Sequence, residues 1–130
     1  MQPVILYATT AATFLILDAI MLTLVMKPLF TRHIGPQLAD PIRILPAAAF
    51  YLAYVAGLVY LVSLPALRTG TPLILPAVII GLVAYGTYEF TSWSVMRDWH
   101  PSMVVTDTLW GGVLTALSAW AGVTLTKALT

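Results

Sequence analysis

Apolar residues fill four long runs of the chain, and polar residues collect in the short segments between them. The runs extend over residues 3–29, 44–64, 73–96 and 103–128. Each run is long enough to cross a membrane, because about 20 apolar residues in a helix span a hydrocarbon core of about 30 Å. The pattern therefore predicts an all-α polytopic membrane protein in which residues 1–130 form a single domain of four transmembrane helices.

The connections between the runs predict how these helices pack. Short connections follow the second and third runs, and short connections join antiparallel neighbours, so we expect an up-and-down bundle. Pro28 and Pro65 lie at the ends of runs, where proline punctuates a helix without removing an interior hydrogen bond. The longer connection, residues 30–43, is expected to lie along the membrane interface as a short helix.

Composition excludes several other classes of protein. The chain is 60% hydrophobic and only 8% charged, whereas soluble domains carry about 25% charged residues. It has no cysteine, so disulfides and thiolate metal sites are excluded. The net charge is +1 and the basic residues are scattered along the chain, so no nucleic acid is expected as a partner.

The basic residues also predict an orientation. On the side of the first and third connections lie four of them, Lys27, Arg32, Arg43 and Arg97. On the other side lie two, Arg68 and Lys127. Cytoplasmic loops of membrane proteins carry the excess of Lys and Arg. We therefore expect the first and third connections to face the cytoplasm and both termini to lie outside it.

Three acidic residues interrupt the apolar runs at one depth. A helix rises about 1.5 Å per residue. By this measure Asp18 lies about 23 Å and Glu89 about 26 Å from the outer boundary of the membrane core. Asp107 lies about 8 Å from the cytoplasmic boundary. Acids inside membranes face the bundle interior and mark functional sites. We therefore expect the three carboxyl groups to share one polar cavity near the cytoplasmic leaflet, with at least one of them protonated at neutral pH.

Helical periodicity indicates which faces meet around these acids. The third run has one face on which residues recur every four positions, namely Gly81, Tyr85, Glu89 and Trp93. The fourth run has a face of small and polar residues, which permit close contact between helices. They are Asp107, Gly111, Thr115, Ser118 and Gly122. On the second run, the predicted close-approach face consists of Ala49, Ala53 and Gly57. The supporting residues expected beside the acids are Tyr51, Tyr54, Tyr88, Thr91, Ser92 and Trp110.

Three stretches of the sequence resemble the DUF2177 family of small four-helix bacterial membrane proteins. They are LILDAIML around Asp18, YGTYEFTSW around Glu89 and DTLWGGVLTAL from Asp107, and the resemblance covers nearly the whole chain. It implies that the family positions are Asp18, Tyr88, Glu89, Thr91, Asp107, Trp110 and Gly111, with departures at Met21, Glu89 and Ser92. It also implies a place in the bacterial cytoplasmic (inner) membrane. Because relatives are often encoded near lipid-modifying enzymes, membrane lipids are the partners it suggests.

Three functions fit these features. The first is a protein that binds or modifies a lipid-like or other hydrophobic small molecule, with Asp18, Glu89 and Asp107 as acid, base or ion ligands. The second is a proton- or cation-coupled small transporter acting as an oligomer. The third is an accessory or structural subunit paired with another membrane protein. The sequence names no substrate, cofactor or metal.

Packing alone could also explain the polar residues. Asp18 and Glu89 would then be neutral acids that hydrogen-bond between helices, and Asp107 would cap the start of the fourth helix. The tryptophans other than Trp110 are expected in the interfacial aromatic belts. His33 and His100 are expected to be solvated loop residues.

Overall fold

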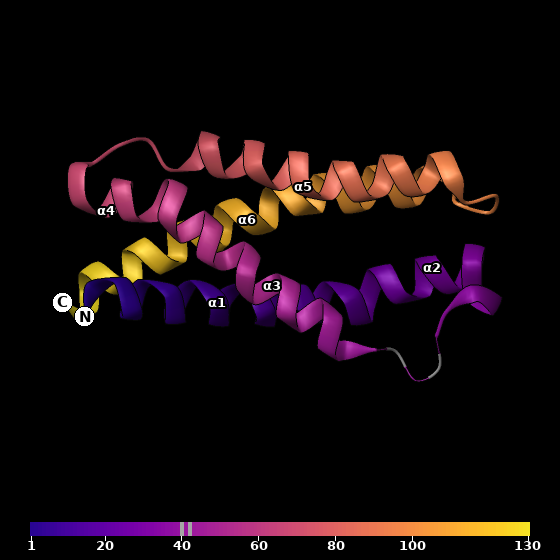
Figure 1. Cartoon of the computed structure of the whole chain (residues 1–130), viewed down its shortest axis with the longest axis horizontal. Coiled ribbons are helices and arrows are strands. Elements are labelled where there is room, and N and C mark those ends of the chain that lie inside the picture. The colour runs from indigo at the N-terminus through magenta and orange to yellow at the C-terminus, as the bar shows by residue number, and fades with distance from the viewer. Residues whose placement is uncertain (40, 42) are drawn as a thin grey trace.

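Four helical columns run back and forth along the molecule in a computed structural model that describes residues 1–39, 41 and 43–130. Figure 1 shows that both termini lie at one end, which we call the termini end. The connections after the first and third columns lie at the opposite end, which we call the loop end. Each column contains a helix long and apolar enough to cross a membrane. The predicted all-α, four-span bundle is confirmed.

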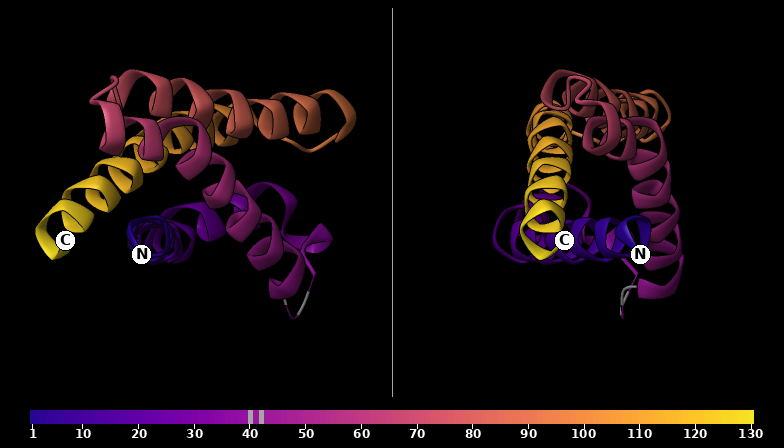
Figure 2. Two further views of the ribbon diagram at one scale, coloured as in Figure 1. Left: turned by 60° about the vertical axis from the view of Figure 1, so that its left-hand side comes forward. Right: turned by 90° about the vertical axis from the view of Figure 1, so that its left-hand side faces the viewer.

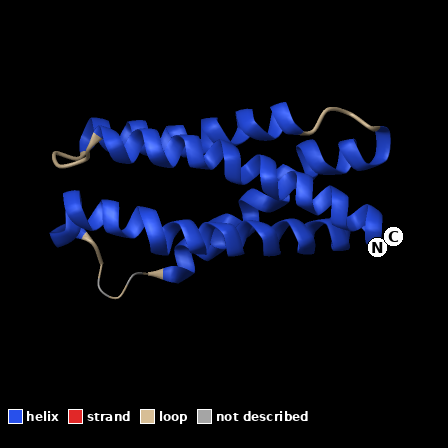
Figure 3. Ribbon diagram, turned by 180° about the vertical axis from the view of Figure 1, so that it is seen from behind, coloured by secondary structure: helices blue, strands red, loops and turns tan. Residues whose placement is uncertain are grey.

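Each column is built from one or more helical segments. The first contains α1 (Gln2–Met21), the π-helical turn η1 (Leu22–Met26), α2 (Lys27–Ile34) and the 3₁₀ turn η2 (Gly35–Gln37). The second contains α3 (Ile44–Leu58), the π-helical turn η3 (Val59–Ser63) and α4 (Leu64–Thr69). The third is α5 (Ile74–Val95) and the fourth is α6 (Pro101–Leu129). Figure 3 shows that only short connections interrupt this helical structure in the described part of the chain.

Two prolines lie inside columns instead of ending them. Pro28 follows η1 and Pro65 follows η3, and the helix continues past each one. Proline lacks an N–H and its ring clashes with the carbonyl group four residues earlier. In each column the backbone accommodates it with a wider turn, in which Lys27 N–H donates to Leu22 O and Leu64 N–H to Val59 O. The sequence-based boundaries at residues 29 and 64 therefore lie before the observed helix ends.

The first connection differs from its prediction in one respect. A separate short helix was expected along the interface within residues 30–43, but helical structure up to Gln37 continues the first column directly. Residues 40 and 42 of this stretch lie outside the described residues.

The columns enclose an interior because two of them cross between the other two. α1 and α5 run in the same direction, and α3 and α6 cross between them on opposite sides (Figures 1 and 2). α6 packs most extensively, against α5 and α1. α3 packs along α1 but makes little contact with α5. This asymmetry leaves one side of the bundle less tightly closed than the other.

Small residues permit the close contacts of α6. A Cβ atom on Gly81 of α5 would overlap the backbone of Gly111 and lie 2.8 Å from the Cα of Gly112. Gly122 faces Thr10 of α1 in the same way. The small and polar stripe predicted on the fourth span is thus the packing face of α6, and its five residues are buried.

The predicted close-approach face of the second span is wrong. Ala49, Ala53 and Gly57 are exposed, and nothing lies within 4 Å of a Cβ placed on Gly57. α3 instead presents larger residues to the interior, including Val55 and Leu58, which are 0% and 1% exposed. Between α3 and its neighbours the packing is made by these bulky residues and the tyrosines beside them.

Candidate functional site

Asp18 is buried in the middle of the first column with one carboxylate oxygen satisfied. The side chain is 5% exposed. The indole N–H of Trp110, on α6, donates a hydrogen bond of 3.2 Å to its Oδ1 atom. Its Oδ2 atom is buried and has no hydrogen-bond partner among the described residues. The Tyr51 side chain of α3 faces the same carboxyl group.

Glu89 and Asp107 form a carboxyl pair between α5 and α6. Glu89 is fully buried and accepts a 3.0 Å hydrogen bond from the indole N–H of Trp99 at Oε1. Asp107 is 8% exposed and its carboxyl group faces that of Glu89, whose Oε2 atom is buried without a hydrogen-bond partner among the described residues. Two buried carboxyl groups that face each other repel when both are charged, so a shared proton would stabilise the pair.

A cavity of about 270 Å³ opens beside these acids. Asp18 and Asp107 line it together with four tyrosines, Tyr51, Tyr54, Tyr85 and Tyr88. Aliphatic and aromatic side chains complete the lining: Leu22, Met26, Phe30, Ala47, Phe50 and Ala84. All four columns contribute, and the two carboxyl groups are the acidic part of an otherwise apolar and aromatic surface.

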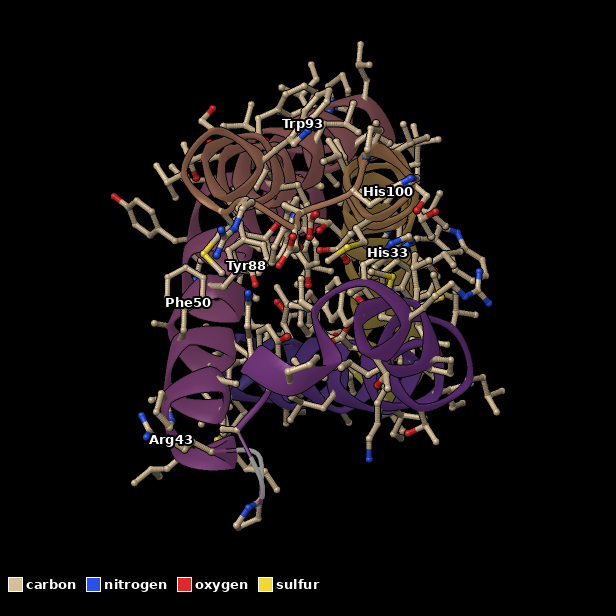
Figure 4. The ribbon with its side chains drawn as sticks, turned by 90° about the vertical axis from the view of Figure 1, so that its right-hand side faces the viewer. His33, Arg43, Phe50, Tyr88, Trp93 and His100 are labelled. Carbon is tan, nitrogen blue, oxygen red and sulfur yellow. The ribbon has the colours of Figure 1, made fainter. Side chains whose placement is uncertain are left out.

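The side of the cavity between α3 and α5 is open. Phe50 on α3 and Tyr88 on α5 both line the cavity, yet they are 63% and 52% exposed. Figure 4, which looks onto the loop end, shows the two side chains beside the central space between these helices. α3 makes little contact with α5. The opening between Phe50 and Tyr88, which we call the mouth, therefore faces the side of the bundle and not one of its ends.

An aromatic cluster holds the cavity wall in place. The centroid of the Phe14 ring lies 5.4 Å from that of the Tyr51 ring and 5.6 Å from that of the Tyr54 ring. Tyr54 packs edge-on against Tyr85 at 6.4 Å, and its hydroxyl is 2.8 Å from Thr115 Oγ1. The Tyr85 hydroxyl is buried without a hydrogen-bond partner in the described structure.

The three acids do not occupy equivalent places. Asp18 and Asp107 line the cavity, whereas Glu89 lies behind Asp107 and is not part of the lining. Asp18 and Asp107 are close enough to interact electrostatically. Among the described residues, no group of three or more His, Asp or Glu side chains is arranged to hold a metal ion. The catalytic or ion-binding role of the acids stays a prediction.

The supporting residues divide into two groups. Tyr51, Tyr54 and Tyr88 line the cavity, and Trp110 binds Asp18. Thr91 is exposed and bonds back to carbonyl groups of its own helix, and Ser92 is outside the lining as well. Thr91 and Ser92 were expected beside the acids, and neither lines the cavity.

Asp107 does not cap a helix. α6 begins at Pro101, and its N-cap is His100, whose side chain accepts a hydrogen bond from the Ser102 N–H. Asp107 therefore lies beyond the first turn, where the unpaired N–H groups of a helix start are out of reach. The capping explanation for this acid is wrong.

Trp99 is a residue whose place the sequence did not reveal. It was expected in an interfacial belt, but it is 7% exposed, lies in the connection between α5 and α6, and binds Glu89. Its ring packs on Phe30 at 5.6 Å and edge-on against Tyr88 at 5.8 Å. Its only sequence signal was its position ten residues after an intramembrane acid.

The two histidines meet at the loop end. The rings of His33 and His100 stack with centroids 4.1 Å apart (Figure 4). Ser102 Oγ lies 2.8 Å from His100 Nδ1 and 3.5 Å from His33 Nε2. His100 is exposed and His33 is half-buried, so both lie at the edge of the molecule but are partners of each other.

Comparison with known proteins places the chain in one family. The family described as predicted membrane protein (DUF2177) matches residues 3–124. No curated protein and no solved structure matches the chain. The matched region contains the second and third columns, most of the first and fourth, the three acids and both tryptophans that bind them. The protein therefore belongs to the DUF2177 family of predicted membrane proteins.

Proposed function

We propose that this protein binds an amphipathic, lipid-like molecule in the cavity between its four columns. The polar group of the ligand would lie at Asp18 and Asp107, and its apolar part would leave through the mouth between α3 and α5. The observation that carries this proposal is the cavity itself, with two carboxyl groups on an otherwise apolar and aromatic lining. Ligand sites in proteins have this composition, with a few polar groups that orient the ligand within an apolar pocket.

The size of the cavity supports a ligand that is only partly enclosed. Its volume of about 270 Å³ equals that of on the order of nine water molecules at about 30 Å³ each. A head group and the first few methylene groups would fill this space. The remainder of a long chain would have to lie outside, which requires an opening into an apolar environment.

The position of the mouth meets this requirement. Phe50 and Tyr88 flank it, and these side chains are themselves 63% and 52% exposed. Apolar residues exposed on membrane-spanning helices contact lipid chains. An apolar chain passing between Phe50 and Tyr88 would therefore stay in contact with hydrocarbon along its length.

Basic residues support the cytoplasmic leaflet as the source of the ligand. Lys27, Arg32, Arg43 and Arg97 belong to the loop-end half of the molecule, as do the acids and the cavity. The excess of basic residues favours the cytoplasm for that end. The ligand would then enter from the inner leaflet of the bacterial cytoplasmic membrane, and both termini would lie in the periplasm.

Photolabelling would test this proposal directly. The protein in lipid nanodiscs is incubated with dodecanol that carries a diazirine group on its chain, and the labelled peptides are mapped by mass spectrometry. We expect labelling around Phe50 and Tyr88 that unlabelled dodecanol competes away. Two alanines of α3 give a matched pair of variants. Both are exposed, but Ala47 lines the cavity and Ala53 does not.

The matched variants decide the interpretation. Ala47→Trp should fill part of the cavity and abolish the saturable labelling, and Ala53→Trp should leave it unchanged. Labelling that is spread evenly over the lipid-facing surfaces and cannot be saturated would refute the proposed function. So would equal labelling of the two variants.

A further inference from the structure

We infer that the ligand of this cavity carries a positive charge, in the form of an ammonium group attached to an apolar chain. The inference rests on the proposed function and specifies the chemistry of the head group. It follows from the charge of the cavity, from an unsatisfied acceptor atom and from the aromatic wall.

Among the described residues, the cavity lining contains acidic side chains and no basic ones. Asp18 and Asp107 are its ionisable acids, and no Lys, Arg or His is among the residues that line it. A carboxylate removed from water without a counter-ion is costly, and intramembrane acids are usually paired for this reason. The donors that face Asp18 are the indole of Trp110 and the hydroxyl of Tyr51, and neither carries a positive charge. A cationic ligand would supply the missing charge.

One carboxylate oxygen of Asp18 lacks a hydrogen-bond donor among the described residues. Asp18 Oδ2 is buried without a hydrogen-bond partner in the described part of the chain, although the residue lines an open cavity. Buried polar atoms in native proteins nearly always have a partner. An ammonium group offers N–H donors as well as charge, and charge-assisted hydrogen bonds are stronger than neutral ones. One group would therefore satisfy both deficits of Asp18.

The wall of the cavity favours the same ligand. Six aromatic residues line the space beside the acids, namely Phe30, Phe50, Tyr51, Tyr54, Tyr85 and Tyr88. The faces of aromatic rings attract cations, and rings arranged around a pocket are a common means of binding ammonium groups. A wall that only enclosed an apolar chain could consist of aliphatic side chains.

The same lining disfavours an anionic head group. A phosphate or carboxylate at the acid end would meet Asp18 and Asp107 with no basic side chain of the cavity to balance it. An ammonium group can come from a free hydrophobic amine or from the head group of a phospholipid, in which a phosphate follows. The two sources differ in whether that phosphate is tolerated next to the acids.

Competition against the photoreactive dodecanol separates these possibilities. The unlabelled competitors share a dodecyl chain and differ in the head group: dodecylammonium, dodecanol, dodecanoate and dodecyl phosphoethanolamine. We expect dodecylammonium to compete at a concentration at least about ten-fold lower than dodecanol, since a hydrogen bond to a charged group adds about 1.5–3 kcal/mol. Dodecanoate should be the weakest. Competition by the phosphoethanolamine equal to that of dodecylammonium would identify a lipid head group as the source, and weaker competition a free amine.

Two further outcomes distinguish failure of this inference from failure of the proposed function. If dodecylammonium and dodecanol compete equally, the cavity binds amphiphiles without a preference for charge, and only the inference is overturned. If dodecanol itself never labels the site saturably and dodecylammonium protects nothing, both fail.

Variants assign the preference to the cavity. Asn at position 18 keeps an acceptor for the Trp110 indole but removes the charge, so Asp18→Asn should lose the ten-fold preference for dodecylammonium and keep the labelling by dodecanol. Asp98→Asn is the matched control, because Asp98 is exposed at the loop end, bonds Gln37 and does not line the cavity. If Asp98→Asn reduces the preference as much as Asp18→Asn does, the cation is attracted by the molecular surface and the inference is overturned.

Discussion

One substitution of glycine by alanine should change stability in opposite directions at two places in this bundle. At Gly81 of α5, the new Cβ would overlap the carbonyl group of Gly111 and lie 2.8 Å from Gly112 Cα. At Gly57 of α3, nothing lies within 4 Å of the new Cβ. Both residues lie within helices, so the comparison separates helix packing from intrinsic helix preference.

The expected magnitudes follow from these contacts. Alanine is preferred to glycine within a helix by about 0.5–1 kcal/mol, so Gly57→Ala should be neutral or stabilising by up to that amount. Carbon atoms pack at about 3.5–4 Å, and a gap of about 0.5–1 Å forfeits a quarter to a half of the dispersion attraction. Gly81→Ala must move α5 away from α6 by about this distance. Overpacking costs about 1–3 kcal/mol. The overlapped atoms are backbone atoms, which cannot rotate away, so the upper part of this range applies and a net loss of about 1–2.5 kcal/mol remains.

Unfolding of the purified variants in dodecyl maltoside would measure this difference. Helical circular dichroism is followed during titration with sodium dodecyl sulfate, with the parent protein as reference. The separation of α5 from α6 should also disturb Glu89 and Asp107, which belong to these two helices. A Gly81→Ala variant as stable as the parent, or as Gly57→Ala, would refute the α5–α6 contact described here.

Three further predictions concern the acids, their tryptophan and the orientation. Trp99→Phe removes the donor to Glu89 Oε1 and should destabilise the protein by about 1–3 kcal/mol in the same titration, whereas an unchanged midpoint would show that this bond adds no stability. Glu89→Gln keeps the shape of the side chain, so its stability should stay within about 1 kcal/mol of the parent, since hydrogen bonds within membranes average about 0.6 kcal/mol. Cells that depend on Glu89→Gln or Asp18→Asn should lose the phenotype of the native gene, and full retention by both variants would leave the acids as packing residues. Because the chain has no cysteine, Gln2→Cys and Asp98→Cys can each be labelled singly in intact cells with an impermeant maleimide. Gln2→Cys should react and Asp98→Cys should not, and the reverse result would invert the proposed orientation.

The sequence by itself determined the class of the fold and the level of the acids. Apolar runs of this length can satisfy their backbone groups in a bilayer only as helices, so four spans follow directly. Depth along a helix depends only on residue number, which explains why Asp18 and Asp107 could be placed at one level before their contacts were known. The packing face of α6 was also visible, because small and polar residues recur along it.

Only the tertiary structure decided how the helices are rotated about their axes. In lipid, the outer face of a helix is as apolar as the inner one, so hydrophobic periodicity does not tell them apart. For this reason the small residues Ala49 and Ala53 were assigned to the interior although bulky residues of α3 fill it. Thr91 was expected beside the acids, but its hydroxyl bonds back to its own helix and it does not line the cavity.

The partners of the acids also depended on contacts distant in the sequence. Trp110 meets Asp18 across 92 positions of the chain because α1 and α6 pack together. Trp99 reaches Glu89 because the connection between α5 and α6 folds back over the loop end. Neither pairing follows from a spacing, since each depends on where two separately formed helices meet. The cavity has the same origin, because α3 leans on α1 and leaves its side toward α5 open.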